Sequence, residues 1–354
     1  MTGATARHTP GPGSAARHTP GPGSAARHTP GPGSAARHTP GPGSAAHLTH
    51  QGLIYGTDEE FLSATVPFCL DGLEQDDAVL AVTTAANIGL LRGALGGTAE
   101  QVEFVDADDW YRAPGRTLGA YHRYVDRHTA DGAHARVRVI GEPVWHGRDR
   151  LETAEWTRYE AAINVAFADC PAWIVCPYDT RALPADVVAG ARHTHPELVA
   201  GPAAHPSDHY TPPDTGRRSW ERRLAPVTVD GREAVLDFAA DLSEVRAFVA
   251  ETAGALGLSG ERAGHLVFAA NEVATNAVRH GGGHGRISLR RAGRRIVCDV
   301  ANPARGGVEW YTGYLPPGRT RGRGHGLWTV RQLCDLVEID TDAGVTTVRL
   351  HLDL

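Results

Sequence analysis

Three polar side chains with acid–base and metal-binding chemistry are spaced four residues apart near the middle of the second half of the chain. They are Glu272, Asn276 and His280, in a segment over 261–280 whose apolar spacing predicts a helix. Residues four apart share one helix face, so the three side chains project together. A carboxylate can accept a proton and a carboxamide oxygen can bind hydrated Mg²⁺, which favours a metal-assisted reaction. The same spacing is also common on solvated helix faces.

Two glycine-rich segments accompany this helix. Gly281–Gly283 ends it and leaves the backbone open to close approach by a ligand. About forty residues later, Gly322, Gly324 and Gly326 alternate directly before a second predicted helix at 326–335. Such a loop can surround phosphates with backbone amides and direct them at a helix N-terminus. Together the segments predict a phosphate-binding site.

The segment 226–354 resembles the ATPase domains of anti-sigma-factor Ser/Thr kinases, within the GHKL superfamily of histidine kinases, gyrase and MutL. Its E-x-x-x-N-A-V-x-H-G stretch is similar to the family's N-box, and GRGHGL is similar to the glycine-rich G2 box. The resemblance implies a two-layer, Bergerat-type α/β domain that binds ATP and Mg²⁺. It also implies that Glu272 is the general base and Asn276 the Mg²⁺ ligand.

The resemblance assigns further site residues. Those expected to surround the phosphates are His280, Gly281, Gly322, Gly324, Gly326 and Leu327. Thr347 would line the adenine side. Arg246 falls where the family places an arginine that faces a protein partner, although a helical arginine is otherwise a solvated surface residue.

One motif departs from the family. Its G1 box is D-x-G-x-G, with an aspartate that reads the adenine amino group, whereas this chain has Asn302 at the aspartate position and Ala304 at the first glycine. Using Asp299 instead would break strand alternation. An asparagine oxygen can still accept from an amino group but without charge assistance, which predicts weaker nucleotide affinity.

The chain contains no lysine, so all 35 of its Lys+Arg residues are arginine. This excludes Walker A ATPases, pyridoxal-phosphate enzymes and S-x-x-K acyl enzymes. It also excludes the eukaryotic-type protein kinase fold, which needs a lysine on a strand. The net charge is -6 with no basic surplus in any domain, so we expect no direct DNA binding.

Composition and pattern divide the chain into four parts. Residues 1–46, with four copies of RHTPGPGSAA, predict a disordered tail whose repeat histidines are a weak metal-binding alternative. Residues 47–199 alternate strands and helices, which predicts a largely parallel, three-layer αβα domain. Residues 200–225 predict a linker. Residues 226–354 predict a mixed sheet with helices on one face.

Within these domains the pattern predicts specific elements. In the first domain the expected strands are 78–82, 102–105, 137–140 and 173–176, and the expected helices are 58–72, 86–95, 116–129 and 151–168. In the second, the expected strands are 234–238, 286–291, 295–301, 336–340 and 345–352, and the expected helices are 242–256, 261–280 and 326–335.

The first domain resembles the MEDS sensory module of DcmR-type regulators. The resemblance is carried by H-x-x-L-x-Y at 50–55, GEPVW at 141–145, Y-E-x-x-I-N at 159–164 and CPYD at 176–179. It implies a small-ligand sensor with a P-loop-like fold that has lost nucleotide binding, in keeping with the missing lysine. The implied pocket residues are His50, Tyr55, Glu142, Trp145, Tyr159 and Tyr178. Alternatively, the aromatic residues are core residues and Glu142 caps a helix.

The five cysteines form no C-x-x-C pair and mostly lie in apolar runs, as is typical of buried thiols in a reducing compartment. No apolar run is long enough to span a membrane, and the N-terminus lacks a signal-peptide pattern. We therefore expect a cytoplasmic protein without membrane contact. The sequence leaves open whether it forms a homodimer.

Together the resemblances imply a signalling protein in which a ligand sensor controls an anti-sigma-factor kinase. Its partners would be a sigma factor and a STAS-type anti-anti-sigma protein phosphorylated on Ser or Thr. Loop 303–321 would close as a lid, and Arg319, Arg321 or Arg323 would meet the γ-phosphate. The competing hypothesis is a non-catalytic, ATP-dependent switch. A histidine kinase is less favoured because no helical pair with an H-box precedes the ATPase segment.

Overall fold

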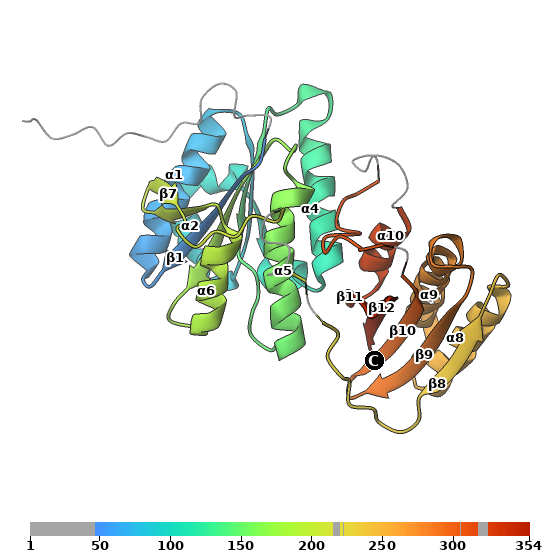
Figure 1. Ribbon diagram of the computed structural model, residues 1–354. Helices are drawn as coiled ribbons and strands as arrows, with labels where there is room; N and C mark the ends of the chain where they lie inside the picture. Colours follow the sequence, from blue (N-terminus) through green and yellow to red (C-terminus); the bar gives the residue numbers. More distant parts are fainter. Residues whose placement is uncertain (1–46, 215–219, 222, 305, 318–324) are drawn as a thin grey trace, which may run out of the picture. The chain divides into compact units, whose positions relative to one another are not determined.

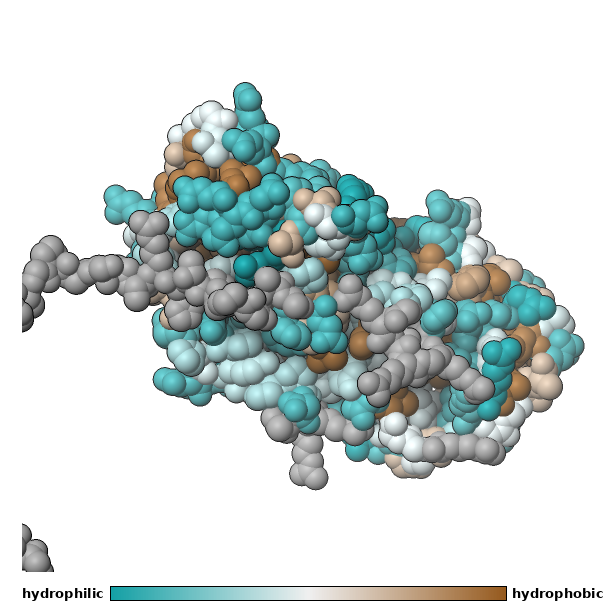
Figure 2. Space-filling view, turned by 90° about the horizontal axis from the view of Figure 1, so that it is seen from above, coloured by the Kyte–Doolittle hydropathy of each residue, from teal (hydrophilic) through white to brown (hydrophobic). Residues whose placement is uncertain are grey.

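We describe a computed structural model over residues 47–214, 220–221, 223–304, 306–317 and 325–354. The predicted disordered tail, Gly322, Gly324 and the three candidate lid arginines lie outside the described residues. All described residues belong to one compact unit, which contains two separate sheets (Figure 1). The face seen in Figure 2 is mostly hydrophilic, with apolar side chains in smaller patches.

The first sheet has seven strands in the order β3-β2-β4-β5-β1-β6-β7. All of its pairings are parallel except β6–β7, which confirms the largely parallel sheet. The strands are β1 (Thr49–Tyr55), β2 (Ala78–Thr83), β3 (Glu103–Asp106), β4 (Val137–Gly141), β5 (Ala172–Asp179), β6 (Glu197–Ala200) and β7 (Ala203–Pro206).

Helices cover both faces of this sheet. Alternate residues of one strand enter different hydrophobic clusters: Val79 and Ala81 of β2 pack with α1 and α2, whereas Leu80 and Val82 pack with α4, α5 and α6. This division confirms the three-layer αβα architecture. The helices are α1 (Asp58–Glu74), α2 (Ala85–Leu95), α3 (Ala107–Trp110), α4 (Pro114–Thr129), α5 (Arg150–Ala166) and α6 (Ala185–Thr194), with 3₁₀ turns at Gly96–Gln101 and Ala130–Gly132.

Local sequence explains where the principal helices begin. The Thr57 hydroxyl accepts a hydrogen bond from the Glu60 amide at the start of α1. At α5, Asp149 and Glu152 form a reciprocal capping box. Such caps satisfy amides that a helix leaves without an internal partner, and each contributes about 1 kcal/mol.

The second sheet has five strands in the order β11-β12-β10-β9-β8, and its helices pack into one hydrophobic cluster with it. Every pairing is antiparallel, so the mixed sheet that we expected is wrong in this respect. The elements are β8 (Ala234–Phe238), α8 (Ser243–Ala255), α9 (Gly260–His280), β9 (Gly285–Ala292), β10 (Arg295–Pro303), α10 (His325–Leu333), β11 (Leu336–Asp342) and β12 (Val345–Asp353).

Part of the expected linker is structured. β7 lies within it and pairs with β6. Further along, Trp220 is 6% exposed and its ring centroid lies 5.9 Å from that of Trp310. The Pro- and Asp-rich composition that suggested a linker is also compatible with a short edge strand, because an edge strand needs only one partner.

Among the described residues, no helix is long and apolar enough to cross a membrane. All five cysteines are free thiols and are buried. This agrees with the expectation from their apolar flanking residues.

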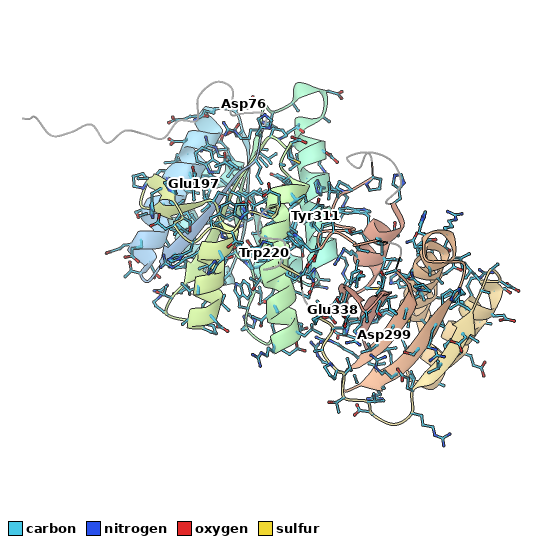
Figure 3. The ribbon with its side chains drawn as sticks, viewed as in Figure 1. Asp76, Glu197, Trp220, Asp299, Tyr311 and Glu338 are labelled. Carbon is cyan, nitrogen blue, oxygen red and sulfur yellow. The ribbon has the colours of Figure 1, made fainter. Side chains whose placement is uncertain are left out.

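The face of the second sheet opposite its helices carries a buried charge network. The Asp299 carboxylate, whose residue is labelled in Figure 3, accepts hydrogen bonds from Arg349 Nε at 2.8 Å and from Arg290 Nη2 at 2.8 Å. Burial alone would raise the pKa of Asp299, but the two guanidinium groups outweigh it and lower the pKa. Asp299 therefore binds a proton less readily in the folded state than in the unfolded chain.

We predict that Asp299→Asn lowers the free energy of unfolding at pH 7 by about 3–5 kcal/mol, since it removes the carboxylate that bridges two buried guanidinium groups and leaves Arg290 with Glu233 alone. Because the pKa of Asp299 is lowered on folding, its contribution is present above the unfolded-state pKa of about 4 and is lost as the pH falls further. Denaturant unfolding at several pH values checks this. Asp237→Asn, at an exposed pair with Arg286, is the control and should change stability little. A constant difference between wild type and Asp299→Asn down to pH 2 would contradict the account.

Candidate functional site

A cavity of about 240 Å³ opens between α9 and the edge of the second sheet formed by β10, β11 and β12. Five of the predicted site residues line it: Asn276, His280, Gly281, Asn302 and Leu327. Three further lining residues, Gly306, Gly307 and Val308, belong to the expected lid loop. The sequence had not singled out the others, which are Val273, Ala277, Ile339, Thr346 and Val348. Most of the latter are apolar, so the cavity combines an apolar wall with a few carboxamide and backbone groups. That combination is typical of a site for a flat, partly polar ligand.

Glu272 does not line this cavity but lies one helical turn away, beside Gly326. A Cβ atom added to Gly326 would be 2.8 Å from Glu272 Oε2 and 3.8 Å from Asn276 Nδ2. The first turn of α10 therefore approaches both polar side chains of α9 closely, and only glycine fits without displacing the carboxylate. This arrangement brings a candidate base, a candidate metal ligand and the N-terminus of a helix together.

The strand β10 directs Asn302 into the cavity and Asp299 away from it. Cys298 and Val300 belong to the core under the helices, and Asn302 continues this face by alternation. The Asn302 Nδ2 donates to the Pro303 carbonyl at 2.9 Å, which fixes the orientation of the amide. Its oxygen is then the atom that can accept a hydrogen bond from a ligand.

Gly281 is required beside Asn302, because a Cβ at Gly281 would collide with the Asn302 amide. Ala304, the other departure from the expected motif, does not line the cavity. Its N–H instead donates to the Gly344 carbonyl at 2.8 Å. The main-chain flexibility at this turn is supplied two residues later by Gly306, whose φ of 137° disfavours any other residue.

Thr347 lies on the opposite face of β12 from the cavity, and Thr346 lines the cavity in its place. The register pairs Asn302 with Thr346 and Ala301 with Thr347. Val348 and Leu350 mark the buried face of the strand, so the period of two selects Thr346. The sequence contained this signal, because Val348, Leu350 and Leu352 all fall on even-numbered positions.

Arg246 lies on the exposed surface of α8, where its Nη1 donates to Asn271 Oδ1 of α9 at 2.9 Å. It is outside the cavity, as expected for a residue that meets a partner. Its role in partner binding stays a prediction.

A second cavity, of about 520 Å³, lies at the carboxyl ends of the parallel strands in the first domain. Tyr55, Glu142 and Trp145 line it, as expected for this edge of an α/β sheet. Around the mouth are charged side chains, including Asp58 and Arg181. This cavity is large enough for a small organic ligand.

Glu142 forms the polar centre of this second cavity. Its carboxylate accepts hydrogen bonds from the Thr83 hydroxyl, from the Thr84 amide at 3.2 Å and from Asn87 Nδ2 at 2.9 Å. Tyr55 also donates to Glu142, at 3.3 Å. Burial, followed by the Glu142 charge, raises the pKa of Tyr55. Because Thr84 is the N-cap of α2, the alternative that Glu142 serves the start of a helix also has a basis in the structure.

His50, Tyr159 and Tyr178 do not join this second cavity, so the six expected pocket residues do not form one pocket. All three are at most 3% exposed and lie within the α4–α5–α6 side of the domain. His50 and Tyr55 are five positions apart on β1, and an odd separation places them on opposite faces of a strand.

Two protein-family models match the chain. The model of the methanogen/methylotroph DcmR sensory (MEDS) domain matches residues 49–196. The model of the histidine kinase-like ATPase domain matches residues 237–352. No curated protein is similar enough to count as a match.

Among solved structures, the chain is similar to the RsbU and RsbW domains of Rv1364c from Mycobacterium tuberculosis. The sequences are 21% identical, the match covers 35% of this chain and 33% of that chain, and the TM-score is 0.27. The match thus spans about a third of that protein's length.

The two cavities fall within the two matched segments, and the folds agree with those expected for each. Residues 49–196 therefore form a MEDS-type sensory domain, and residues 237–352 form a histidine kinase-like ATPase domain.

We predict that Asn302→Asp tightens ATP binding about fivefold to tenfold, because a carboxylate would give charge assistance to the hydrogen bond from the adenine amino group. Calorimetric titration of the purified full chain with Mg-ATP measures the change. GTP, which lacks this amino group, is the control ligand and should gain nothing. Equal tightening for both nucleotides, or none for ATP, would show that Asn302 does not read the base.

Proposed function

We propose that the second domain is an ATP-dependent Ser/Thr protein kinase of the anti-sigma-factor type, which phosphorylates a STAS-type anti-anti-sigma protein and binds a sigma factor. The observation that carries this proposal is the convergence of Glu272, Asn276 and Gly326 beside the cavity that Asn302 lines. We further propose that the chain works in the cytoplasm, where its free thiols would persist.

The residues present fit a magnesium nucleotide. Asn276 offers a hard oxygen ligand, as Mg²⁺ prefers, and Gly326 lets the first turn of α10 come close to Asn276, where its backbone amides could bind phosphate. The cavity volume suits a purine base, and Asn302 offers an acceptor for its amino group. When bound, ATP would supply the phosphoryl group, and Mg²⁺ would offset the negative charge of the phosphates.

The chain's own residues would then act on the protein substrate. Glu272 lies on the same face of α9 as Asn276, one turn earlier, and would accept the proton of the Ser or Thr hydroxyl. Asn276 would hold the cation, and the first turn of α10 would orient the phosphates. Such positioning is the main protein contribution to phosphoryl transfer.

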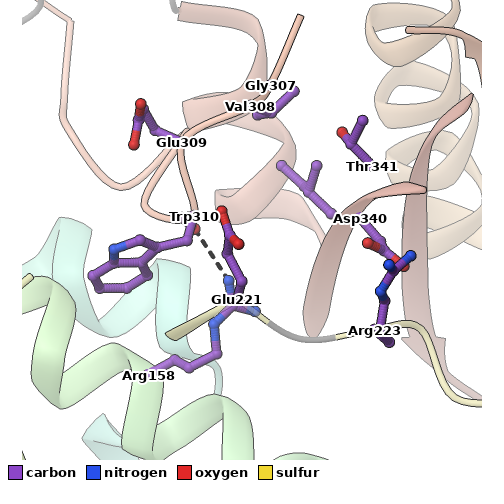
Figure 4. Close-up of a pocket in the computed structure, with 10 residues that line it drawn as sticks. Arg158, Glu221, Arg223, Gly307, Val308, Glu309, Trp310, Asp340 and Thr341 are labelled. Carbon is purple, nitrogen blue, oxygen red and sulfur yellow. Dashed lines mark hydrogen bonds between the residues drawn. The ribbon is translucent and has the colours of Figure 1, made fainter. Parts of the chain in front are cut away.

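The loop between β10 and α10 supplies a physical route from the sensory domain to the ATPase cavity. At one end, Gly306, Gly307 and Val308 line the cavity. Two residues further along, Trp310 is 3% exposed and belongs to the same hydrophobic cluster as α4 and α5. Figure 4 shows Arg158 of α5 directed at this loop, and its Nη2 donates to the Trp310 carbonyl at 3.1 Å.

Further contacts extend this route. Arg331 of α10 donates from Nε to the Thr312 carbonyl at 3.0 Å, and its guanidinium carbon lies 4.0 Å from the Tyr314 ring centroid. The next residue of α10, Gln332, donates from Nε2 to the Gly115 carbonyl of α4 at 2.7 Å. A ligand-induced shift of α4 or α5 would therefore displace the loop that lines one side of the ATPase cavity. These contacts support our proposal that the MEDS domain controls the ATPase.

A non-catalytic ATP-dependent switch is the second candidate. The replacement of the usual G1 aspartate and first glycine by Asn302 and Ala304 favours it, since a weakly held nucleotide could signal occupancy without phosphotransfer. The two candidates differ in one measurable property, the transfer of the γ-phosphate to a protein.

We predict that Glu272→Gln lowers phosphotransfer at least 100-fold while Mg-ATP affinity changes less than threefold, because the amide keeps the shape of the side chain but cannot accept the proton. The measurement is transfer of labelled γ-phosphate to STAS-type proteins encoded near this gene, with parallel nucleotide titrations. Glu261→Gln, at the exposed start of the same helix, is the matched control. Tight nucleotide binding without labelling by the wild type would favour the switch.

We predict that binding of a non-hydrolysable Mg-ATP analogue slows amide hydrogen exchange in α5 of the wild type, because Trp310 in the loop between β10 and α10 contacts α5. In Trp310→Ala this effect on α5 should disappear, while protection around the cavity persists. Trp173→Ala is the control, because Trp173 packs on the opposite face of the first sheet. Undiminished protection of α5 in Trp310→Ala would show that the loop does not couple the domains.

A further inference from the structure

Four side chains with metal-binding atoms meet in the interior of the MEDS domain. His50 comes from β1, Glu160 from α5, Cys176 from β5, and His195 directly follows α6. One ligand atom from each lies within 4.8 Å of the other three, and each residue is at most 3% exposed. We call these four residues the His–Cys–Glu cluster. None of them lines the cavity around Glu142, so a ligand bound there would not account for them.

The Nδ1 atoms of both histidines already have hydrogen-bond partners. His50 Nδ1 lies 3.0 Å from Asn164 Oδ1, and Asn164 uses its Nδ2 to donate to the Thr194 carbonyl at 2.7 Å. His195 Nδ1 lies 2.8 Å from the Ala191 carbonyl. Since these oxygens can only accept, each Nδ1 carries a proton, and each neutral ring presents the lone pair of its Nε2 to the cluster. Metal-binding histidines in proteins are commonly oriented by this kind of bond.

The two Nε2 atoms face other electron-pair donors. His50 Nε2 is 3.5 Å from Cys176 Sγ and 3.7 Å from Glu160 Oε2, and His195 Nε2 is 3.3 Å from the same Glu160 oxygen. None of the histidine contacts to Glu160 is aligned as a hydrogen bond among the described residues. The Cys176 thiol and the Tyr178 hydroxyl are near enough to Glu160 to act as donors. A cation between the carboxylate and the two lone pairs would offset the buried charge more completely.

Three of the six separations between ligand atoms are close to those of a tetrahedral metal site, and all six are within 4.8 Å. With zinc bonds of about 2.0–2.3 Å, neighbouring ligand atoms in a tetrahedron are roughly 3.3–3.6 Å apart. The three contacts in the cluster fall at or close to this range. Two imidazoles, one thiolate and one carboxylate form a donor set that suits Zn²⁺ better than Mg²⁺ or Ca²⁺.

The surrounding chain makes room for this arrangement. Gly52 of β1 lies under the His195 ring, and a Cβ atom there would be 3.1 Å from His195 Cγ. A larger residue would push the ring away from Glu160 and Cys176. The interstrand register places Gly52 opposite Cys176, so the small residue, the thiol and the ring occupy one face of the sheet.

We propose that the His–Cys–Glu cluster binds one Zn²⁺ ion, which joins β1, β5, α5 and α6 at a closed, four-ligand site. A site with four protein ligands and no exposed position is of the structural kind and stabilises the fold that surrounds it. The sensory cavity lies on the same sheet, at the strand ends, so the ion would hold the scaffold on which that cavity is built.

The alternative occupant is a proton shared between a histidine and Glu160. In that case Cys176 remains a thiol, because burial and the Glu160 charge raise its pKa well above the usual range. A metal ion would instead hold Cys176 as a thiolate. Sulfur–metal bonding at Cys176 therefore separates the two.

The test uses the full chain produced in medium containing Co²⁺, a spectroscopic substitute for Zn²⁺, and washed with a chelator to remove loosely held ions. We expect about one Co²⁺ per chain, visible bands of a tetrahedral ion and a near-ultraviolet sulfur-to-cobalt band. The repeat tail has histidines but no cysteine, so it cannot produce the sulfur band. Absence of that band from the wild type would overturn the proposal.

Two cysteine variants make the assignment specific. Cys176→Ala should lose the sulfur band, whereas Cys69→Ala should keep it, because Cys69 is equally buried but lies on the opposite face of the sheet. A band that persists in Cys176→Ala would overturn the proposal.

A positioning variant keeps the proposal testable if Cys176→Ala does not fold. Asn164→Leu removes the acceptor that orients His50 and should weaken Zn²⁺ binding about 10- to 100-fold in competition with a chromophoric chelator. Asn164→Asp, which retains an acceptor, should rescue the affinity. Equal Zn²⁺ affinity in Asn164→Leu and wild type would contradict the orienting role that we assign to His50 Nδ1.

Discussion

The alternation of side chains along each strand decides which polar groups reach the sites of this protein. On β10 it sends Asn302 to the ATPase cavity and Asp299 to the opposite face, where arginines neutralise it. On β1 it sends His50 and Tyr55 to opposite faces of the first sheet. A shift of one residue in either strand would exchange the two faces. On β10, for example, it would turn Asp299 away from its arginine partners. The apolar residues of the core therefore fix the positions of the functional ones.

In this chain without lysine, several buried arginines each donate hydrogen bonds to more than one acceptor. Arg138 is 1% exposed and donates to both Asp77 and the Phe68 carbonyl. Arg158 joins Glu155 to the Trp310 carbonyl, and Arg331 joins the carbonyls of Thr312 and Val337. A guanidinium group can satisfy several acceptors at fixed angles, whereas an ammonium group is a compact charge. The loop beside the ATPase cavity is held largely by such multiple contacts.

The predictions from sequence were most accurate where a pattern was local and periodic. The helix at 261–280 was observed as Gly260–His280, and the strand at 234–238 was observed with the same limits. Short edge strands such as β7, and β1 with its mixture of polar and apolar residues, have little periodic signal and were not predicted. The antiparallel pairing of the whole second sheet depends on contacts between distant strands, which a single sequence does not specify.

In the candidate sites, too, local spacing was predicted correctly and contacts between distant segments were not. Spacing of four residues was enough to place Asn276 and His280 on one wall, whereas the family resemblance alone pointed to Thr347 and the period of the strand places Thr346 in the cavity. The His–Cys–Glu cluster joins residues from 50 to 195 that share no spacing rule. It becomes visible only when the parallel strands and the end of α6 are brought together.

The central claim, that the second domain holds a catalytic nucleotide site, is tested most directly by a crystal structure of the full chain with Mg²⁺ and a non-hydrolysable ATP analogue. We expect adenine in the cavity with its amino group on Asn302, Mg²⁺ on Asn276, and the terminal phosphate beside Glu272 and the start of α10. A nucleotide bound with its phosphates remote from Glu272, or a cavity that stays empty at saturating analogue, would contradict it.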